Sequence, residues 1–163
     1  MKWLVTALAG FVFATGGRVH LVAAHGVELR VPAGWHRLAP TQNGAIDPRT
    51  LLVVGTDGVI RNLNSVCQIA AYRVPATGAV VVVVGWRTAT SGGGDGRPTG
   101  RTPLQNLVRV TKPSFECYDG LGAAASLVLG GKAYQVNVMV GDRASKERIA
   151  EALAVGRSFD VAR

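Results

Sequence analysis

Two histidines are the side chains of this chain whose positions could support metal chemistry. A chain that began at His25 would carry an imidazole beside a free amino group, and His36 could add a second imidazole. Imidazole and amine nitrogens both suit Cu(II), so this arrangement predicts a copper-binding N-terminus. The alternative is that His25 belongs to a frayed terminus and His36 is a surface residue beside Trp35. Copper binding is therefore a second hypothesis, and the first hypothesis, given below, expects no cofactor.

The sequence motifs of common hydrolases are missing. There is neither a Gly-x-Ser-x-Gly nucleophile motif nor a His-Glu-x-x-His zinc motif. Glycosidases need two facing carboxylates, but four of the aspartates each precede Gly or Pro, which is the ordinary composition of turns. These four are Asp47, Asp57, Asp95 and Asp119. We therefore expect that the protein is not an enzyme.

Two tryptophans and two arginines are the candidates for ligand binding. Trp35 and Trp86, like Tyr72, Tyr118 and Tyr134, could line an apolar pocket or contact a partner, although aromatic side chains more often pack in a core or on a sheet face. Arg97 and Arg101 lie in a glycine-rich stretch, residues 91–101, that has no apolar side chain to anchor it. These four residues are the predicted binding residues.

The glycine-rich stretch allows two interpretations. Its backbone amides could approach an anion, and the two arginines would add positive charge. The phosphate-binding loop of nucleotide-binding proteins, however, needs Gly-Lys-Ser/Thr at the start of a helix, and here Pro98 and Pro103 intervene. A solvated surface loop is the favoured interpretation.

Cys67 and Cys117 are the only cysteines of the chain. In an exported protein such a pair predicts a structural disulfide, because extracytoplasmic compartments are oxidising. A redox-active or metal-binding pair would favour close spacing such as Cys-x-x-Cys, which is absent. Closing a loop of about fifty residues stabilises a fold by roughly 4 kcal/mol in the chain-entropy model.

The N-terminus has the composition of a secretory signal. Lys2 is followed by a mainly apolar run from Trp3 to Phe13, and small residues precede His25. We expect residues 1–24 to be a signal peptide cut before His25, with a cut near Gly16 or Gly17 as the alternative. The apolar run is shorter than the roughly 20 residues that span a bilayer. Residues 25–163 would then form a single domain, secreted or in the cell envelope, without a stable transmembrane span.

Composition narrows the class of partner. The formal net charge is +8 at pH 7, with 18 Lys and Arg against 10 Asp and Glu. Such a balance favours anionic partners. The basic residues are scattered singly, without a Lys/Arg-rich block or a nucleic-acid motif, so no nucleic-acid binding is expected.

Hydrophobic patterning predicts a sheet around one strand. Residues 79–85 include five consecutive valines, which favour a strand with both faces covered near the middle of a sheet. Two β-rich runs flanking Gly130-Gly131 predict a hairpin. The predicted strands are residues 27–31, 51–55, 66–74, 79–87, 123–129, 132–140 and 158–161, with 66–74 as the antiparallel neighbour of the valine strand and 115–118 as an extended segment.

One amphipathic helix is predicted near the C-terminus. Between Ala144 and Val155 the apolar residues fall on one side and the charged residues largely on the other. Asp142 or Ser145 could cap its N-terminus, and Gly156 is placed to stop it. The fold class is therefore α+β, an antiparallel sheet with helices packed on it and one disulfide.

Two stretches resemble exported proteins of the Mog1/PsbP-like fold. They are Val27-x-Leu29-x-Val31-Pro32-Ala33-Gly34-Trp35 and the strand, helix and Ser-Phe ending from Tyr134 to Phe159. Small uncharacterised secreted proteins of actinobacteria show a similar pattern. The resemblance implies an antiparallel sheet with helices on both sides, and a binding or assembly role instead of catalysis. It transfers no site residues, since fold alone does not give function.

The first hypothesis from the sequence is therefore a non-catalytic binding or assembly module. It would be an exported monomer that binds a protein or a small apolar ligand in the cell envelope. A copper-binding protein that uses His25 is the alternative.

Overall fold

The structure, a computed structural model, describes residues 18–41 and 46–162. The predicted apolar run from Trp3 to Phe13 and the alternative cut near Gly16 or Gly17 lie outside the described residues. None of the described helices is long and apolar enough to cross a membrane.

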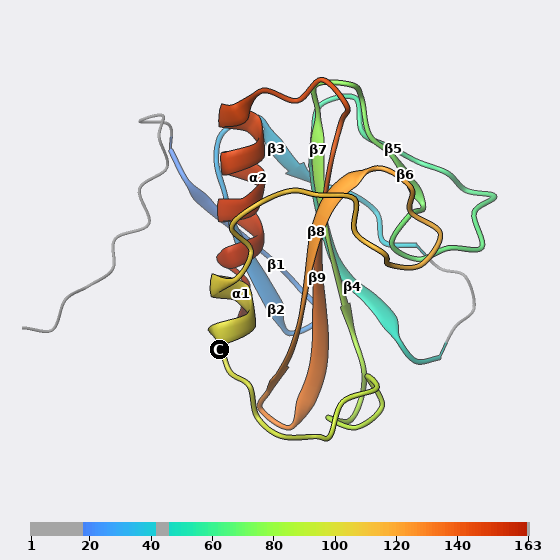
Figure 1. Cartoon of the computed structure of the whole chain (residues 1–163), viewed down its shortest axis with the longest axis vertical. Helices are drawn as coiled ribbons and strands as arrows, with labels where there is room; N and C mark the ends of the chain where they lie inside the picture. Colours follow the sequence, from blue (N-terminus) through green and yellow to red (C-terminus); the bar gives the residue numbers. More distant parts are fainter. Residues whose placement is uncertain (1–17, 42–45, 163) are drawn as a thin grey trace, which may run out of the picture.

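A five-stranded antiparallel sheet is the centre of the fold (Figure 1). Its strand order is β3-β4-β7-β9-β8, so the order differs from the order along the chain. Strands β8 and β9 form the predicted hairpin, in which Leu129 pairs with Lys132 across Gly130-Gly131. The strands are β3 (Trp35–Arg37), β4 (Arg49–Thr56), β7 (Ala79–Gly85), β8 (Leu121–Leu129) and β9 (Lys132–Val140).

Strand β7 is the third of the five strands and contains the valine run. Val82 pairs with Val53 of β4 on one side and with Asn137 of β9 on the other. Every residue from Ala79 to Val84 is at most 1% exposed, so both faces of the strand are covered. The prediction of a central strand covered on both faces is confirmed.

Helix α2 and a small second sheet cover the first face of the central sheet (Figure 1). Val81, Val83 and Val138 pack there in one core with Leu153 of the helix and Phe159. The short helix α1 contributes Leu104 to the same core. The elements on this face are α1 (Thr102–Gln105), α2 (Lys146–Arg157) and the three-stranded sheet of β1 (His20–Ala24), β2 (Val27–Val31) and β10 (Asp160–Val161).

Irregular chain covers the second face. Val80, Val82 and Met139 pack there against Tyr72 and Phe115. Two segments, residues 57–74 and 111–120, supply this cover, and their regular structure is limited to the strand pair β5 (Ile60–Arg61) and β6 (Tyr72–Arg73). The α+β antiparallel fold is thus present, but both described helices lie on the first face and not on both sides of the sheet.

The disulfide ties the two covering segments together. Cys67 and Cys117 are bonded across 50 residues, with their Cα atoms 6.5 Å apart. Beside the bond, the Glu116 carboxylate accepts hydrogen bonds from the backbone N–H groups of Ile69 at 2.6 Å and Ala70 at 2.9 Å, and also from Gln68. A carboxylate that accepts several backbone N–H groups satisfies donors which an irregular segment leaves without strand partners.

Three local predictions are wrong. Of residues 66–74, Tyr72–Arg73 alone form a strand, and the neighbours of β7 are β4 and β9. Residues 115–118 contain a turn, in which Glu116 has a φ of 47°. Gly156 lies inside α2, where a Cβ atom would come within 2.8 Å of Val138 Cγ2. It permits close packing of helix on sheet and does not end the helix.

Two further predictions concern the cap of helix α2 and the cut before His25. Ser145 caps α2 by accepting a hydrogen bond from the Arg148 backbone N–H at 3.1 Å, as predicted for one of its two candidate caps.

Strand β1 pairs with β2 throughout, from His20 with Val31 to Ala24 with Val27. A cut before His25 would therefore fall in the turn of this hairpin and remove β1, whereas a cut near residue 16 or 17 would retain it.

Gly141 joins the end of β9 to the turn that precedes β7. Its backbone N–H donates to the Gly78 carbonyl at 2.9 Å, and that of Arg143 donates to Ala76 at 2.8 Å. A Cβ atom at Gly141 would overlap the backbone oxygens of Pro75 and Ala76. Because backbone atoms cannot rotate away as a side chain can, this site requires glycine.

The substitution Gly141→Ala should therefore lower the free energy of unfolding by about 3 kcal/mol. Gly94→Ala is the matched control, because the nearest atom to a Cβ there lies 3.9 Å away and the backbone is not left-handed. Urea unfolding followed by circular dichroism measures both. Equal midpoints for the two variants would contradict the proposed close approach.

Candidate functional site

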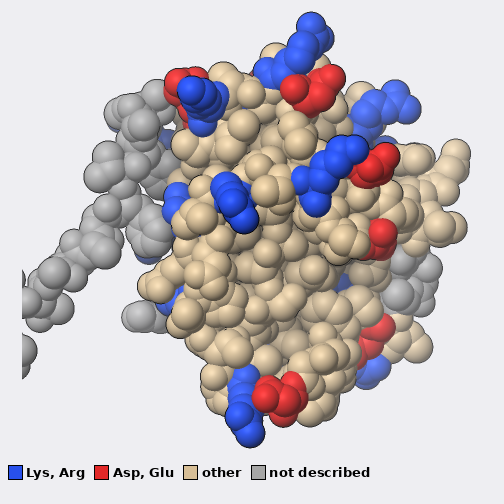
Figure 2. All heavy atoms as spheres, viewed as in Figure 1, with Lys and Arg blue, Asp and Glu red and all other residues tan. Residues whose placement is uncertain are grey.

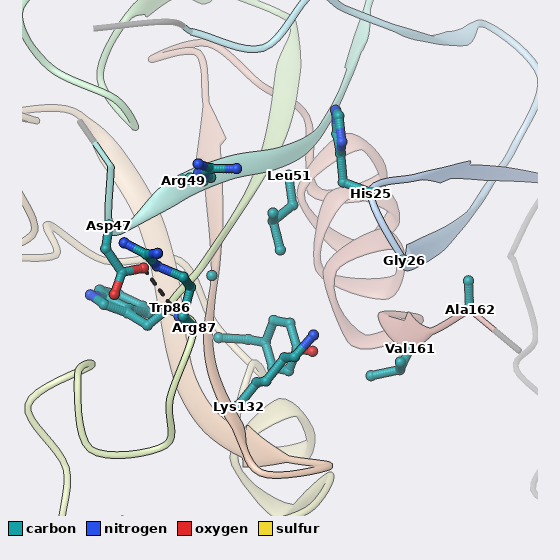
Figure 3. A pocket seen from close by; sticks show the side chains of 12 residues that line it. His25, Gly26, Asp47, Arg49, Leu51, Trp86, Arg87, Lys132, Val161 and Ala162 are labelled. Carbon is teal, nitrogen blue, oxygen red and sulfur yellow. Dashed lines mark hydrogen bonds between the residues drawn. The ribbon is translucent and has the colours of Figure 1, made fainter. Parts of the chain in front are cut away.

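An open pocket of about 320 Å³ lies at one end of the central sheet (Figure 3). Strands β4, β7 and β9 contribute to it, together with the β1–β2 turn, the end of β10 and Ala162. We call it the cationic pocket. Its lining residues are His25, Gly26, Asp47, Arg49, Leu51, Gly85, Trp86, Arg87, Lys132, Tyr134, Val161 and Ala162.

Strand register brings these residues together. Arg49 of β4 pairs with Gly85 of β7, and Gly85 pairs with Tyr134 of β9, so three strands form one row across the sheet. A register shift between Thr50 and Leu52 interrupts the β4–β7 ladder next to this row. Leu51 lies at that irregularity and lines the pocket.

Trp86 and Tyr134 are the aromatic side chains of the pocket. The Tyr134 ring packs against Phe159 of the core, with the ring centroids 5.2 Å apart, and burial raises the pKa of its hydroxyl. Trp86 follows β7 directly, and its backbone N–H donates to the Ala133 carbonyl at 2.9 Å. The core and the sheet therefore fix the positions of both aromatic residues.

Arg49, Arg87 and Lys132 surround the space into which Leu51 projects (Figure 3). None of them takes part in the ion pairs found among residues 18–41 and 46–162. Among the described residues Asp47 is the one carboxylate of the lining, and it accepts a hydrogen bond from the Arg87 backbone N–H at 3.1 Å. The pocket thus carries more positive than negative charge.

A second, smaller cavity of about 120 Å³ shares Trp86 and Tyr134 with the cationic pocket. The buried side chains of Leu127, Val128 and Ala133 also line it, with the glycine-rich stretch on its other side. We call it the apolar cavity.

A third cavity, of about 390 Å³, lies over the second face between Tyr72 and Tyr118. Its one basic side chain, Lys112, lies 3.6 Å from the Asp119 carboxylate, and Asp142 also lines the cavity. The charged side chains of this lining thus have a negative net charge, whereas those of the cationic pocket have a positive one.

The four predicted binding residues lie in different places. Trp86 lines both the cationic pocket and the apolar cavity, and Arg97 lines the apolar cavity. Trp35 is 3% exposed, and its indole N–H donates to the Glu151 carboxylate at 2.6 Å. Arg101 forms an ion pair with Asp160 and donates to the Phe159 carbonyl at 3.1 Å. Trp35 and Arg101 thus make internal contacts.

The two histidines of the copper hypothesis lie on different elements. His25 is in the β1–β2 turn with a φ of 50° and lines the cationic pocket. His36 is on β3, and its Nδ1 lies 3.5 Å from the Asp57 carboxylate. Within residues 18–41 and 46–162, the one cluster of three metal-ligating types is Cys67, Glu116 and Cys117, whose sulfurs are bonded to each other.

Sequence analysis missed Arg49, Arg87 and Lys132 as site residues, whereas Tyr134 was among the aromatic residues considered for a pocket and lines both the cationic pocket and the apolar cavity. One signal was available: Arg87 and Lys132 each lie at the end of a predicted strand, where the chain leaves the core. Their convergence depends on the strand order, which cannot be read from the sequence pattern.

The chain was compared with models of known protein families and with curated proteins, and it matched none of them.

The three tyrosines of the chain share a shift in pKa. Burial raises the pKa of Tyr118 to about 12, and it also raises the pKa of Tyr72 and Tyr134 above the ordinary value of 10.0. The Tyr118 hydroxyl donates to the Leu121 carbonyl at 2.8 Å, and its ring stacks on Phe115.

Alkaline titration should show this shift. The folded state favours the neutral phenol, so the contribution to stability is complete below pH 10 and is lost as the pH rises toward about 12. We expect phenolate absorbance to appear at higher pH in the folded protein than in the urea-unfolded chain. Tyr118→Phe should reduce the loss of stability over this interval, and coincident folded and unfolded titration curves would refute the shift.

Proposed function

We propose that this protein is an exported, non-catalytic binding module that holds a small anionic ligand in the cationic pocket. The observation that carries the proposal is the set of Arg49, Arg87 and Lys132 beside an apolar lining, none of which forms an ion pair with a carboxylate of the described residues, 18–41 and 46–162. Unpaired cations grouped around a concavity attract anions and raise their local concentration. Concave sites with apolar walls and a few polar groups are typical of ligand-binding sites.

The chemistry of the side chains suits binding. A guanidinium group can donate two parallel hydrogen bonds to a carboxylate or phosphate, and a lysine adds a compact charge. Arg49 uses its Nε to donate to the Ile46 carbonyl at 3.1 Å, which orients the terminal nitrogens that remain for a ligand. Leu51, Trp86 and Tyr134 supply apolar contact area for the rest of the ligand.

The charge pattern elsewhere supports a small ligand over a nucleic acid. Figure 2 shows that basic side chains on the face viewed are scattered and that several lie beside acidic ones. Among the described residues of that face there is no continuous basic stripe of the kind that follows a nucleic-acid backbone.

Export is the part of the proposal that rests on the disulfide and the N-terminal sequence. A disulfide between Cys67 and Cys117 persists in oxidising compartments, and the apolar N-terminal run has the pattern of a secretory signal. The Mog1/PsbP-like resemblance also supports a binding role in the cell envelope.

Binding of benzoate provides a direct test, because it joins a carboxylate to an apolar ring. At low salt we expect benzoate to shift the Trp86 indole N–H signal in a nitrogen–proton NMR spectrum. Lys132→Glu should weaken the affinity about tenfold or more, since a charge-assisted hydrogen bond contributes about 1.5–3 kcal/mol. Added salt should weaken the wild-type affinity as well.

Lys146→Glu is the matched control for this experiment. Lys146 is an exposed lysine at the start of α2 and does not line the cationic pocket. The same change in net charge at that position should leave the affinity unchanged. Equal losses in the two variants, or no response of Trp86 to benzoate, would contradict the proposed function.

A further inference from the structure

The apolar cavity adjoins the cationic pocket through two shared side chains. Trp86 and Tyr134 line both spaces, so a ligand that contacts these rings in the pocket is at the boundary of the cavity. The two spaces differ in chemistry. The cationic pocket holds Arg49, Arg87 and Lys132, whereas the charged residues of the apolar cavity, Asp95 and Arg97, lie 3.3 Å apart as an ion pair.

The floor of the apolar cavity comes from the β8–β9 hairpin. Leu127 is 2% exposed, and Val128 and Ala133 are also buried, so their side chains form a fixed apolar surface. Thr99 joins the glycine-rich stretch to this hairpin, because its hydroxyl accepts a hydrogen bond from the Val128 backbone N–H at 2.8 Å. The cavity thus has a defined floor and a defined opposite side.

The glycine-rich stretch approaches the Trp86 indole at Gly92. A Cβ atom at Gly92 would lie 2.7 Å from Ala133 Cβ and 3.4 Å from Trp86 Cε3. The backbone of the glycine-rich stretch therefore comes close to both the indole and β9, which a larger residue would prevent. This gives the stretch a packing role that the sequence did not reveal.

We propose that the ligand is an amphiphilic anion whose charged group occupies the cationic pocket and whose aliphatic chain passes Trp86 into the apolar cavity. This inference rests on the proposed function, because it uses the same pocket for the anionic group. A neutral, apolar space next to a cationic one complements a molecule with an apolar chain on an anionic head. Burying each methylene contributes roughly 0.8 kcal/mol, which is about fourfold in affinity.

The head group can be a carboxylate or a phosphate, since guanidinium and ammonium groups bind both. Free fatty acids and alkyl phosphates are the two sources of this chemistry. A chain-length series of each, measured by isothermal titration calorimetry below the micelle concentration, distinguishes them. The series runs from acetate through butyrate, hexanoate and octanoate to decanoate, with the alkyl phosphates of matching length beside it.

We expect the affinity to rise about fourfold per methylene up to one chain length and then to level off, because the apolar cavity is finite. Adsorption to an unspecific apolar surface would give no such limit. An affinity that is independent of chain length, or one that continues to rise through decanoate, would overturn the inference.

Ser126→Phe tests the location of the chain. Ser126 is an exposed residue of β8 that lines the apolar cavity and not the cationic pocket, and phenylalanine suits a strand. The larger side chain should fill the cavity, so the affinity should level off at a shorter chain while benzoate binding is retained. Ala124→Phe is the matched control, since Ala124 is exposed two residues earlier on β8 and lines neither space.

The outcomes separate the two proposals. If benzoate binding depends on Lys132 but the chain-length series is flat, the amphiphile is wrong and the anion-binding pocket stands. If neither benzoate nor any member of the series binds, the proposed function itself fails. If Ser126→Phe and Ala124→Phe alter the series equally, the chain does not occupy the apolar cavity and the inference is overturned.

Discussion

Burial of strand β7 on both faces is the constraint on which the rest of the structure depends. A strand of five valines between β4 and β9 exposes apolar side chains to both sides, so the fold needs two separate covers. Helix α2 and the small β1-β2-β10 sheet provide one cover, and irregular chain provides the other. The first cover consists of a helix and paired strands, which satisfy their own backbone hydrogen bonds, whereas the two irregular segments of the second cover depend on contacts with each other.

The disulfide and Glu116 provide that help. The Cys67–Cys117 bond joins two covering segments that are 50 residues apart, and the neighbouring carboxylate accepts three backbone N–H groups. Covalent closure lowers the entropy of the unfolded chain, and the carboxylate satisfies buried or half-buried donors. The second cover is therefore held by two adjacent contacts between the same segments, and this explains how a face without a helix remains packed.

The candidate site lies where the central sheet ends, and it is connected to the core. Tyr134 contacts Phe159 of the core and also lines both the cationic pocket and the apolar cavity. Arg49, Arg87 and Lys132 lie at or just past the ends of strands, where they are exposed and can be charged at little desolvation cost. The aromatic and basic residues of the site thus lie together because β4, β7 and β9 have their ends at the same edge of the sheet.

The sequence by itself determined the elements whose signals are local: the valine strand, the β8–β9 hairpin, helix α2 with Ser145 as one of two candidate caps, and the disulfide pair. The strand, the hairpin and the helix are predicted by periodicity and turn residues within short stretches of chain. The disulfide is predicted because the chain has only two cysteines. Neither kind of prediction requires the tertiary structure. Only the tertiary structure decided that residues 66–74 form mostly irregular cover, that Gly156 packs inside a helix, and that Arg49, Arg87 and Lys132 meet around Tyr134. These outcomes depend on strand order and register between residues far apart in the chain, and a local pattern contains no information about which distant strands pair.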